Sequence, residues 1–406
     1  MNRDPNSIDW KNLKQGYGYA KEVPSQLAML AEGSPEQQEE ALFSLWESLY
    51  HQGSRFEASP FAVPFLWEIL ATADVPLQHQ LIDFLQGLAV GLGEEFLPRG
   101  YDLELEKQRT ESGEWPCLFE NEPARDCYLA VQEKSETFIE FLDPSVHPET
   151  RLSASFAIPH FAEHLARFQG DISRHALRET DFMQLQGLVL CFGMLGRHAQ
   201  ETPDTAWLVD WVTTHSCPTI QVCASIALAT IYESGTPDVA RNKLFTALAQ
   251  AWDLATARPG GNWWNEGDLL GYAATVLPML GEKYRVESTF VLSEALEKLD
   301  VCTFAIPETL LDLLFPASRP DGTWKVTDLD GLQRNCLARL LRTRHWRSWM
   351  IDSLFFSAEL IGDERQAALQ QLIQEITGEN EDRESNPMGR IGNVSSWDFE
   401  TKWPKK

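Results

Sequence analysis

The sequence has little positive charge, no long apolar run and no paired cysteine motif. It holds 34 lysine and arginine residues against 60 aspartate and glutamate residues, a formal net charge of -26 at pH 7. A field of that sign repels phosphate backbones, so we do not expect nucleic acid as a partner. The acidity is compatible with two roles, solubility or attraction to a basic protein.

No apolar run reaches the roughly 20 residues that a membrane span needs, and the opening MNRDPNSIDWKNLKQ has no apolar stretch of signal-peptide length. We therefore expect a cytoplasmic protein without a membrane partner. The 7 cysteines form no C-x-x-C pair. Cys191, Cys223 and Cys302 lie within apolar helical patterns, which favours buried thiols over disulfides.

Patterns typical of strands and of several catalytic folds are also missing. Period-2 alternation rich in Val, Ile and Thr is absent, so we expect no convincing strand. Gly16-x-Gly18 and Gly91-x-Gly93 lack the further Gly or Lys of a phosphate loop, so we interpret both as turns. No G-x-S-x-G motif occurs. We predict no cofactor and assign no catalytic residue.

Helical patterns fill most of the chain. Ser34-Pro35-Glu36-Gln37 has the form of a capping box, and apolar residues follow it at helical spacing. Proline recurs at expected first helical positions, where its missing N–H costs nothing. Further helices are expected to open at Thr202-Pro203 and Thr236-Pro237, and others to cover residues 60–71, 76–91, 123–142, 148–168, 180–195, 218–232, 267–299 with a break near Gly281, 303–314, 328–344 and 363–376.

Paired short helices in units of roughly 35 to 47 residues are typical of helical repeat arrays. The segment FIEFLDPSVHPETRLSASFAI resembles a single HEAT hairpin. We predict an all-α fold, a curved α-solenoid of HEAT- or armadillo-like helical pairs over residues 17–376. We expect an N-terminal leader at residues 1–16, an inserted loop at about 97–122 and a flexible polar tail at 377–406.

Three short motifs carry a resemblance to a known family. They are Tyr-Gly-x-Ala at Tyr17 to Ala20, His-Gln-Gly at His51 to Gly53, and Ala-Val-Pro-Phe-Leu at Ala62 to Leu66. The chain resembles a set of bacterial HEAT-repeat proteins in these motifs and in the stretch LDGLQRNCLARLLRTRHW. That family has no established enzymatic activity, so the resemblance implies a helical repeat architecture and supplies no catalytic residues.

One motif suggests a metal. His160-Phe161-Ala162-Glu163-His164 matches the H-x-x-E-H pattern of inverted zinc peptidases, in which two imidazoles one helical turn apart bind zinc. Catalysis would need a third ligand, for which Glu233 is of a suitable type. Those peptidases carry the motif in a mixed α/β domain that this pattern lacks, so we favour a solvated helix face near Pro159 and assign no metal.

Candidate binding residues lie in three places. His51-Gln52-Gly53 is expected to close a helix, with Gly53 in the left-handed conformation; the functional alternative puts His51 and Gln52 beside Arg55 on a recognition surface. Trp263 and Trp264 lie in a Gly-rich loop, where they would form an interface or fold back under the helices.

The third place is a basic cluster, which would either pair with acidic helices or bind an anion. Its residues are Arg339, Arg342, Arg344, His345 and Arg347, interleaved with Trp346 and Trp349.

The leading hypothesis for function is a non-catalytic binding or inhibitor protein that uses the concave face of the solenoid. Its partner would be another protein, and a basic toxin neutralised in the manner of an immunity protein is the most specific version. The alternative is a hydrolase or nucleic-acid-processing enzyme on the same scaffold, which a basic groove would favour and this composition opposes.

Overall fold

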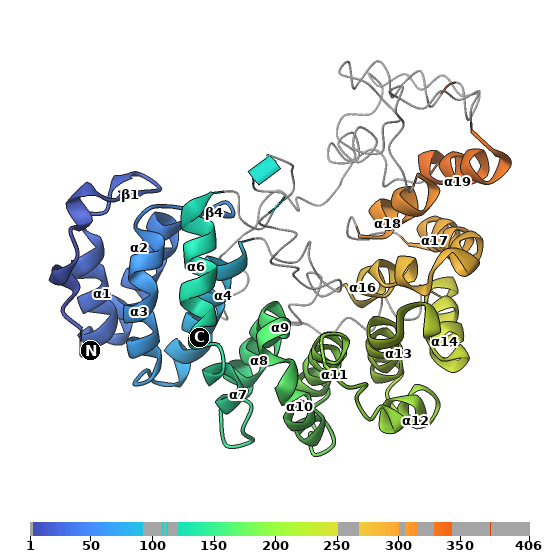
Figure 1. The fold of residues 1–406 in the computed structure, drawn as a ribbon, viewed down its shortest axis with the longest axis horizontal. Coiled ribbons are helices and arrows are strands. Elements are labelled where there is room, and N and C mark those ends of the chain that lie inside the picture. The colour runs from blue at the N-terminus through green and yellow to red at the C-terminus, as the bar shows by residue number, and fades with distance from the viewer. Residues whose placement is uncertain are drawn as a thin grey trace. The chain divides into compact units, whose positions relative to one another are not determined.

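The computed structural model describes residues 3–91, 108, 111–112, 121–250, 268–299, 305–315, 329–342 and 374. The chain divides into two compact units, Met1–Leu314 and Phe315–Lys406. The described residues are mostly helical, which confirms the predicted all-α class (Figure 1). No helix in these ranges combines the length and apolarity that a membrane crossing requires.

The N-terminal elements of the first unit alternate helices with two short hairpins. They are η1 (Pro5–Ser7), η2 (Trp10–Asn12), β1 (Lys14–Gln15), β2 (Gly18–Tyr19), α1 (Val23–Glu32), α2 (Pro35–Leu49), β3 (Tyr50–His51), β4 (Ser54–Arg55), α3 (Ser59–Leu70), α4 (Val75–Val90) and α6 (Glu122–Gln132).

The chain then continues through helices alone in the described residues. They are α7 (Thr137–Glu140), α8 (Pro148–Ala157), η4 (Ile158–Phe161), α9 (Ala162–Leu165), η5 (Ala166–Phe168), α10 (Gln169–Ala176), α11 (Phe182–Arg197), α12 (Ala206–Thr214), α13 (Pro218–Tyr232), η6 (Glu233–Gly235), α14 (Asp238–Ala249), α16 (Leu269–Thr275), η8 (Leu277–Leu280), η9 (Glu282–Tyr284), α17 (Arg285–Lys298) and α18 (Ala305–Leu314). The described part of the second unit contains α19 (Gly331–Arg342).

Most helix starts follow the sequence signals, but α12 begins at Ala206, after the opening expected at Thr202-Pro203. Proline occupies one of the first two positions of α1, α2, α3, α4, α6, α8 and α13. The capping box before α2 is formed as predicted. The Gln37 backbone N–H donates to Ser34 Oγ at 3.4 Å, and the Ser34 N–H donates to Gln37 Oε1 at 2.9 Å.

Each long helix of the first unit packs against helices near it in the sequence. For example, α13 contacts α11, α12 and α14, and α4 contacts α3, α6 and α8. Small residues permit close approach, since a Cβ on Gly193 of α11 would lie 2.7 Å from the Cα of Ala227 on α13. Cys191 and Cys223, on the same two helices, are fully buried thiols, as the sequence predicted.

Two expected helices are interrupted. The pattern at 123–142 divides into α6 and α7, and the pattern at 148–168 divides into α8, η4, α9 and η5. Pro159 lies at the start of η4, where it supplies no backbone N–H for a continuous α-helix. The predicted break near Gly281 is confirmed, because this glycine has a φ of 85° between η8 and η9.

The expectation of no strand is wrong in detail. β1 pairs with β2, and β3 pairs with β4, each as an antiparallel hairpin of two-residue strands. Strands of two residues are too short to produce a period-2 pattern. Residues 3–16, expected as a leader, contain η1, η2 and β1, and Trp10 is buried there with its indole N–H donating to the Pro5 carbonyl at 2.6 Å.

Several expectations lie outside the described residues. They concern most of the loop at 97–122, the helix at 363–376 apart from residue 374, and the tail at 377–406.

Candidate functional site

Two hairpins meet beside the first helices, and Figure 1 shows β1 and β4 at the same end of these helices. The Gly16 N–H donates to the Ser48 carbonyl at 2.8 Å, and the Ala58 N–H donates to the Lys14 carbonyl at 3.0 Å. A Cβ on Gly16 would lie 2.8 Å from the Glu47 carbonyl oxygen, so a larger residue does not fit there. These main-chain contacts join the first hairpin to the end of α2 and to the residue before α3, the two segments that flank the second hairpin.

The hairpins present one group of side chains, which we call the hairpin surface: the exposed Tyr17, Tyr19 and Gln52 and the half-buried His51. The Tyr17 and His51 rings meet edge to face, with centroids 5.3 Å apart and an interplanar angle of 65°. Tyr17 is 66% exposed and Tyr19 is 56% exposed. Tyrosine combines a large apolar ring with a polar tip, which suits it to recognition surfaces.

The structure corrects the role predicted for His51-Gln52-Gly53. Helix α2 ends at Leu49, and the chain enters β3 directly with Tyr50 in an extended conformation. Gln52 and Gly53 have φ values of 51° and 88°, so they form the two central residues of a hairpin turn. Such turns need positive φ at both positions because their twist matches that of the flanking strands. Gly53 is left-handed as predicted, but it does not cap a helix.

Arg55 does not share the hairpin surface. Its residue is only 4% exposed, and its guanidinium donates to the Gly53 carbonyl across the turn. A Cβ on Gly91, the residue after α4, would overlap this guanidinium. Arg55 therefore supports the β3–β4 turn from inside the protein.

The structure also corrects the surface expected at His160. This residue is fully buried, and its Nε2 lies 3.2 Å from Nε2 of Gln86 on α4. Burial lowers the pKa of His160 to about 3, so the imidazole is neutral at physiological pH. Its carbonyl accepts a hydrogen bond from the buried Tyr128 hydroxyl at 3.1 Å. His160 is a core residue, not part of a solvated helix face.

The other members of the zinc-like motif face different surroundings. The chain changes from η4 to α9 after Phe161, so His160 and His164 do not occupy successive turns of one α-helix. His164 Nε2 lies 3.5 Å from Glu136 Oε1, and Glu233 pairs with Arg197 at 3.0 Å. Among the described residues, no group of three or more His, Cys, Asp and Glu side chains is placed to hold a metal ion.

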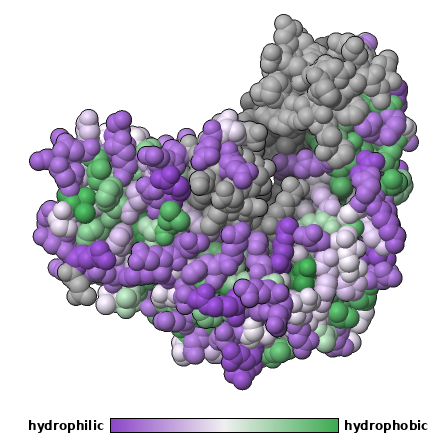
Figure 2. Space-filling model, in the orientation of Figure 1, coloured by the Kyte–Doolittle hydropathy of each residue, from purple (hydrophilic) through white to green (hydrophobic). Residues whose placement is uncertain are grey.

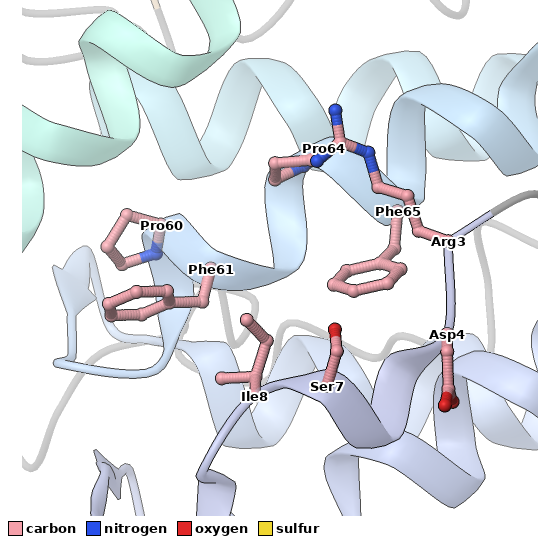
Figure 3. A pocket seen from close by; sticks show the side chains of 8 residues that line it. All are labelled: Arg3, Asp4, Ser7, Ile8, Pro60, Phe61, Pro64 and Phe65. Carbon is pink, nitrogen blue, oxygen red and sulfur yellow. The ribbon is translucent and has the colours of Figure 1, made fainter.

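A pocket of about 350 Å³ lies between the N-terminal segment and α3 (Figure 3). Figure 3 shows Ile8 and Phe61 facing each other in it. Its charged groups are engaged locally: Arg3 Nε lies 3.1 Å from Glu68 Oε1, and the Asp4 carboxylate accepts from the Asn6 N–H at 2.9 Å. We assign this pocket no chemistry.

The remaining sequence candidates cannot be placed on a surface. Trp263, Trp264, Arg344 and Trp346 lie outside the described residues, and the side chain of Arg342, the last residue of α19, also lies outside them.

The face drawn in Figure 2 is mostly hydrophilic, with hydrophobic residues in patches. The sequence marks Tyr17 and Tyr19 only as part of a motif, because local pattern does not reveal that Tyr17 adjoins His51.

In comparisons with known proteins, no family model, no curated protein and no solved structure matches this chain. The chain's own structure defines its class, which is an all-α protein with two apposed β-hairpins beside its first helices.

Proposed function

We propose that this chain is a non-catalytic protein-binding molecule that contacts a basic protein partner through the hairpin surface. The observation that carries the proposal is the contact of the exposed Tyr17 with the half-buried His51, which two separate hairpins bring together. The net charge of -26 favours a partner of opposite charge, because attraction between opposite charges raises the association rate and disfavours acidic partners.

The rigidity of the hairpin surface supports this function. Tyr17 is held at the ring of His51, with its hydroxyl 3.4 Å from His51 Nδ1. The main-chain bonds from Gly16 and Ala58 hold the first hairpin, which carries Tyr17, to the segments on either side of the second hairpin. Aromatic anchors that are already ordered lose little conformational entropy on binding, so more of their contact energy contributes to affinity.

The helix order is compatible with a finer version of the proposal. Successive helices contact their sequence neighbours, as they do in HEAT-like repeat arrays. In that version the chain is an α-solenoid whose concave face holds the partner, and an immunity-type protein that neutralises a basic toxin is its most specific form.

Affinity capture from cells of the source organism tests the proposal. The baits are the full chain, the double variant Tyr17→Ala with His51→Ala, and the control Phe43→Ala, which removes an aromatic side chain that is 57% exposed on α2. We expect the parent and the control to retain the same basic protein and the double variant to lose at least tenfold in affinity for it. Equal retention by all three baits would contradict the proposed role of the hairpin surface.

A further inference from the structure

A row of aromatic side chains follows α12 at one-turn intervals. Trp207 and Trp211 meet edge to face with centroids 4.8 Å apart, and Trp211 lies 5.1 Å from the ring of His215. Phe182, at the start of α11, continues the row with its centroid 6.3 Å from that of His215. We call these four residues the aromatic row.

The aromatic row lies partly in solvent. Trp207, Trp211 and His215 are half-buried, and Phe182 is 52% exposed. The core side of α12 is formed by Leu208 and Val212, which are fully buried. The inner end of the row is anchored, since Trp207 packs on the buried Phe192 with centroids 5.2 Å apart. The helix therefore has its apolar core contacts already, and the row is additional apolar surface.

Two acidic residues, Asp204 and Asp210, adjoin residues of the aromatic row. Both of them and Glu201 are exposed, and none of the three forms an ion pair within the part of the chain that the structure describes. The Asp204 carbonyl accepts the Trp207 indole N–H at 3.2 Å, and Asp210 directly precedes Trp211.

The surrounding sequence supplies no neutralising base. Residues 198–240 contain no Lys or Arg at all. The two other acidic residues of this stretch, Glu233 and Asp238, pair with Arg197 and Arg241, which flank it. The negative charge beside the aromatic row is therefore left for an external cation.

We infer that the aromatic row is a binding site for an arginine-bearing segment of a protein partner, which deepens the proposed function by naming the partner's chemistry. A guanidinium stacks on an indole face and also pairs with a carboxylate. Arginine fits better than lysine, because its planar and weakly hydrated group makes both contacts at once. The row and its carboxylates supply these two elements side by side.

Calorimetry on the full chain tests this site with a synthetic peptide of alternating arginine and glycine. The matched peptide carries citrulline, which keeps the shape of arginine but has no charge. We expect the arginine peptide to bind at least tenfold more tightly. Trp211→Leu should weaken arginine-peptide binding by roughly 2- to 30-fold, whereas Trp211→Phe should retain most of it because the aromatic face remains.

A charge-matched pair of variants separates this site from general attraction to an acidic chain. Asp204→Asn with Asp210→Asn removes two charges beside the row, and Glu39→Gln with Glu40→Gln removes two exposed charges on α2. We expect only the first pair to weaken binding markedly. Equal losses in both pairs, or equal binding of the citrulline peptide, would overturn the inference.

The peptide experiment needs no natural partner, so its failure is distinguishable from failure of the proposed function. If the hairpin variants lose the captured partner but Trp211→Leu leaves peptide binding unchanged, the aromatic row is not the binding site for arginine, and the role of the hairpin surface stands. If the peptide depends on Trp211 while the hairpin variants keep every captured protein, the inference stands and the role of the hairpin surface fails.

Discussion

At the scale of single residues, polar side chains line the contact of α4 with α8 and η4. His79 Nδ1 lies 3.8 Å from Glu149 Oε2, and Gln86 reaches His160 at 3.2 Å. Between these pairs, Asp83 is half-buried on α4 beside Ser153. Burial raises the pKa of Asp83 to about 7, an effect that a hydrogen bond from Ser153 partly offsets.

This carboxyl predicts a pH dependence of stability. The folded chain holds a proton on Asp83 up to about pH 7, whereas the unfolded chain releases it near pH 4. Stability therefore falls as pH rises through this window. Because part of the side chain meets solvent, we expect Asp83→Asn to stabilise the protein by about 2 kcal/mol at pH 8, half of what the full shift corresponds to. Urea unfolding at pH 8 and pH 4.5 measures this, and an equal gain at both values would contradict it.

The burial of His160 predicts how this side chain titrates. Burial lowers its pKa to about 3, so its ring should not titrate between pH 5 and 8 in NMR spectra. The unfolded imidazole takes up a proton near pH 6.5, so stability from this group is lost as pH falls below that value.

The burial of His160 also predicts that zinc does not stabilise the protein. We expect added zinc to leave the unfolding temperature unchanged for the parent and for His164→Ala. A zinc-dependent rise that His164→Ala removes would contradict this assignment.

Residue-level prediction from the sequence succeeded where local pattern carries the information. The burial of Cys191 and Cys223 followed from apolar helical spacing. The burial of His160 did not, because its neighbour Gln86 is distant in the sequence and no local pattern marks their contact.

At the scale of single elements, the capping box of α2 was predictable because all its atoms lie within four consecutive residues. We predict that Ser34→Ala lowers the free energy of unfolding by about 1 kcal/mol, since it leaves a first-turn N–H without its partner. Urea unfolding measures the loss. The control is Ser25→Ala, whose exposed hydroxyl donates to the Glu22 carbonyl at 2.8 Å and which should change stability by less than about 0.5 kcal/mol. Equal losses would argue against the cap.

The β3–β4 turn makes a second prediction at this scale. Gly53→Ala should lower the free energy of unfolding by about 1 to 2 kcal/mol, because its φ of 88° is costly for a residue with a Cβ. Gly170→Ala on α10 should have the opposite sign, since a Cβ there meets nothing within 4 Å and alanine favours the helix. Thermal unfolding compares the two variants. A Gly53→Ala variant as stable as the parent would contradict the proposed cost of positive φ at this turn.

The hairpins show why some elements escaped sequence analysis. Their strands are two residues long, and the turn at Gln52 places a glutamine at positive φ, where asparagine, aspartate or glycine is typical. The helix starts, by contrast, carried strong local signals from proline.

At the scale of the whole molecule, the helical patterns and the missing strand alternation predicted the all-α class. They did not predict which side chains from distant segments meet. Tyr17 and His51 are 34 residues apart, and the contact of Phe182 with His215 likewise joins residues of separate helices. Both candidate surfaces depend on such contacts, so only coordinates bring them together.

The central claim is that the hairpin surface contacts a basic protein partner. Hydrogen exchange of the full chain, with and without the captured partner, tests it most directly. We predict slower exchange in the complex for the backbone amides of residues 14–20 and 50–56, with the middle of α2 unaffected. Unchanged exchange at both hairpins in a saturated complex would contradict the claim.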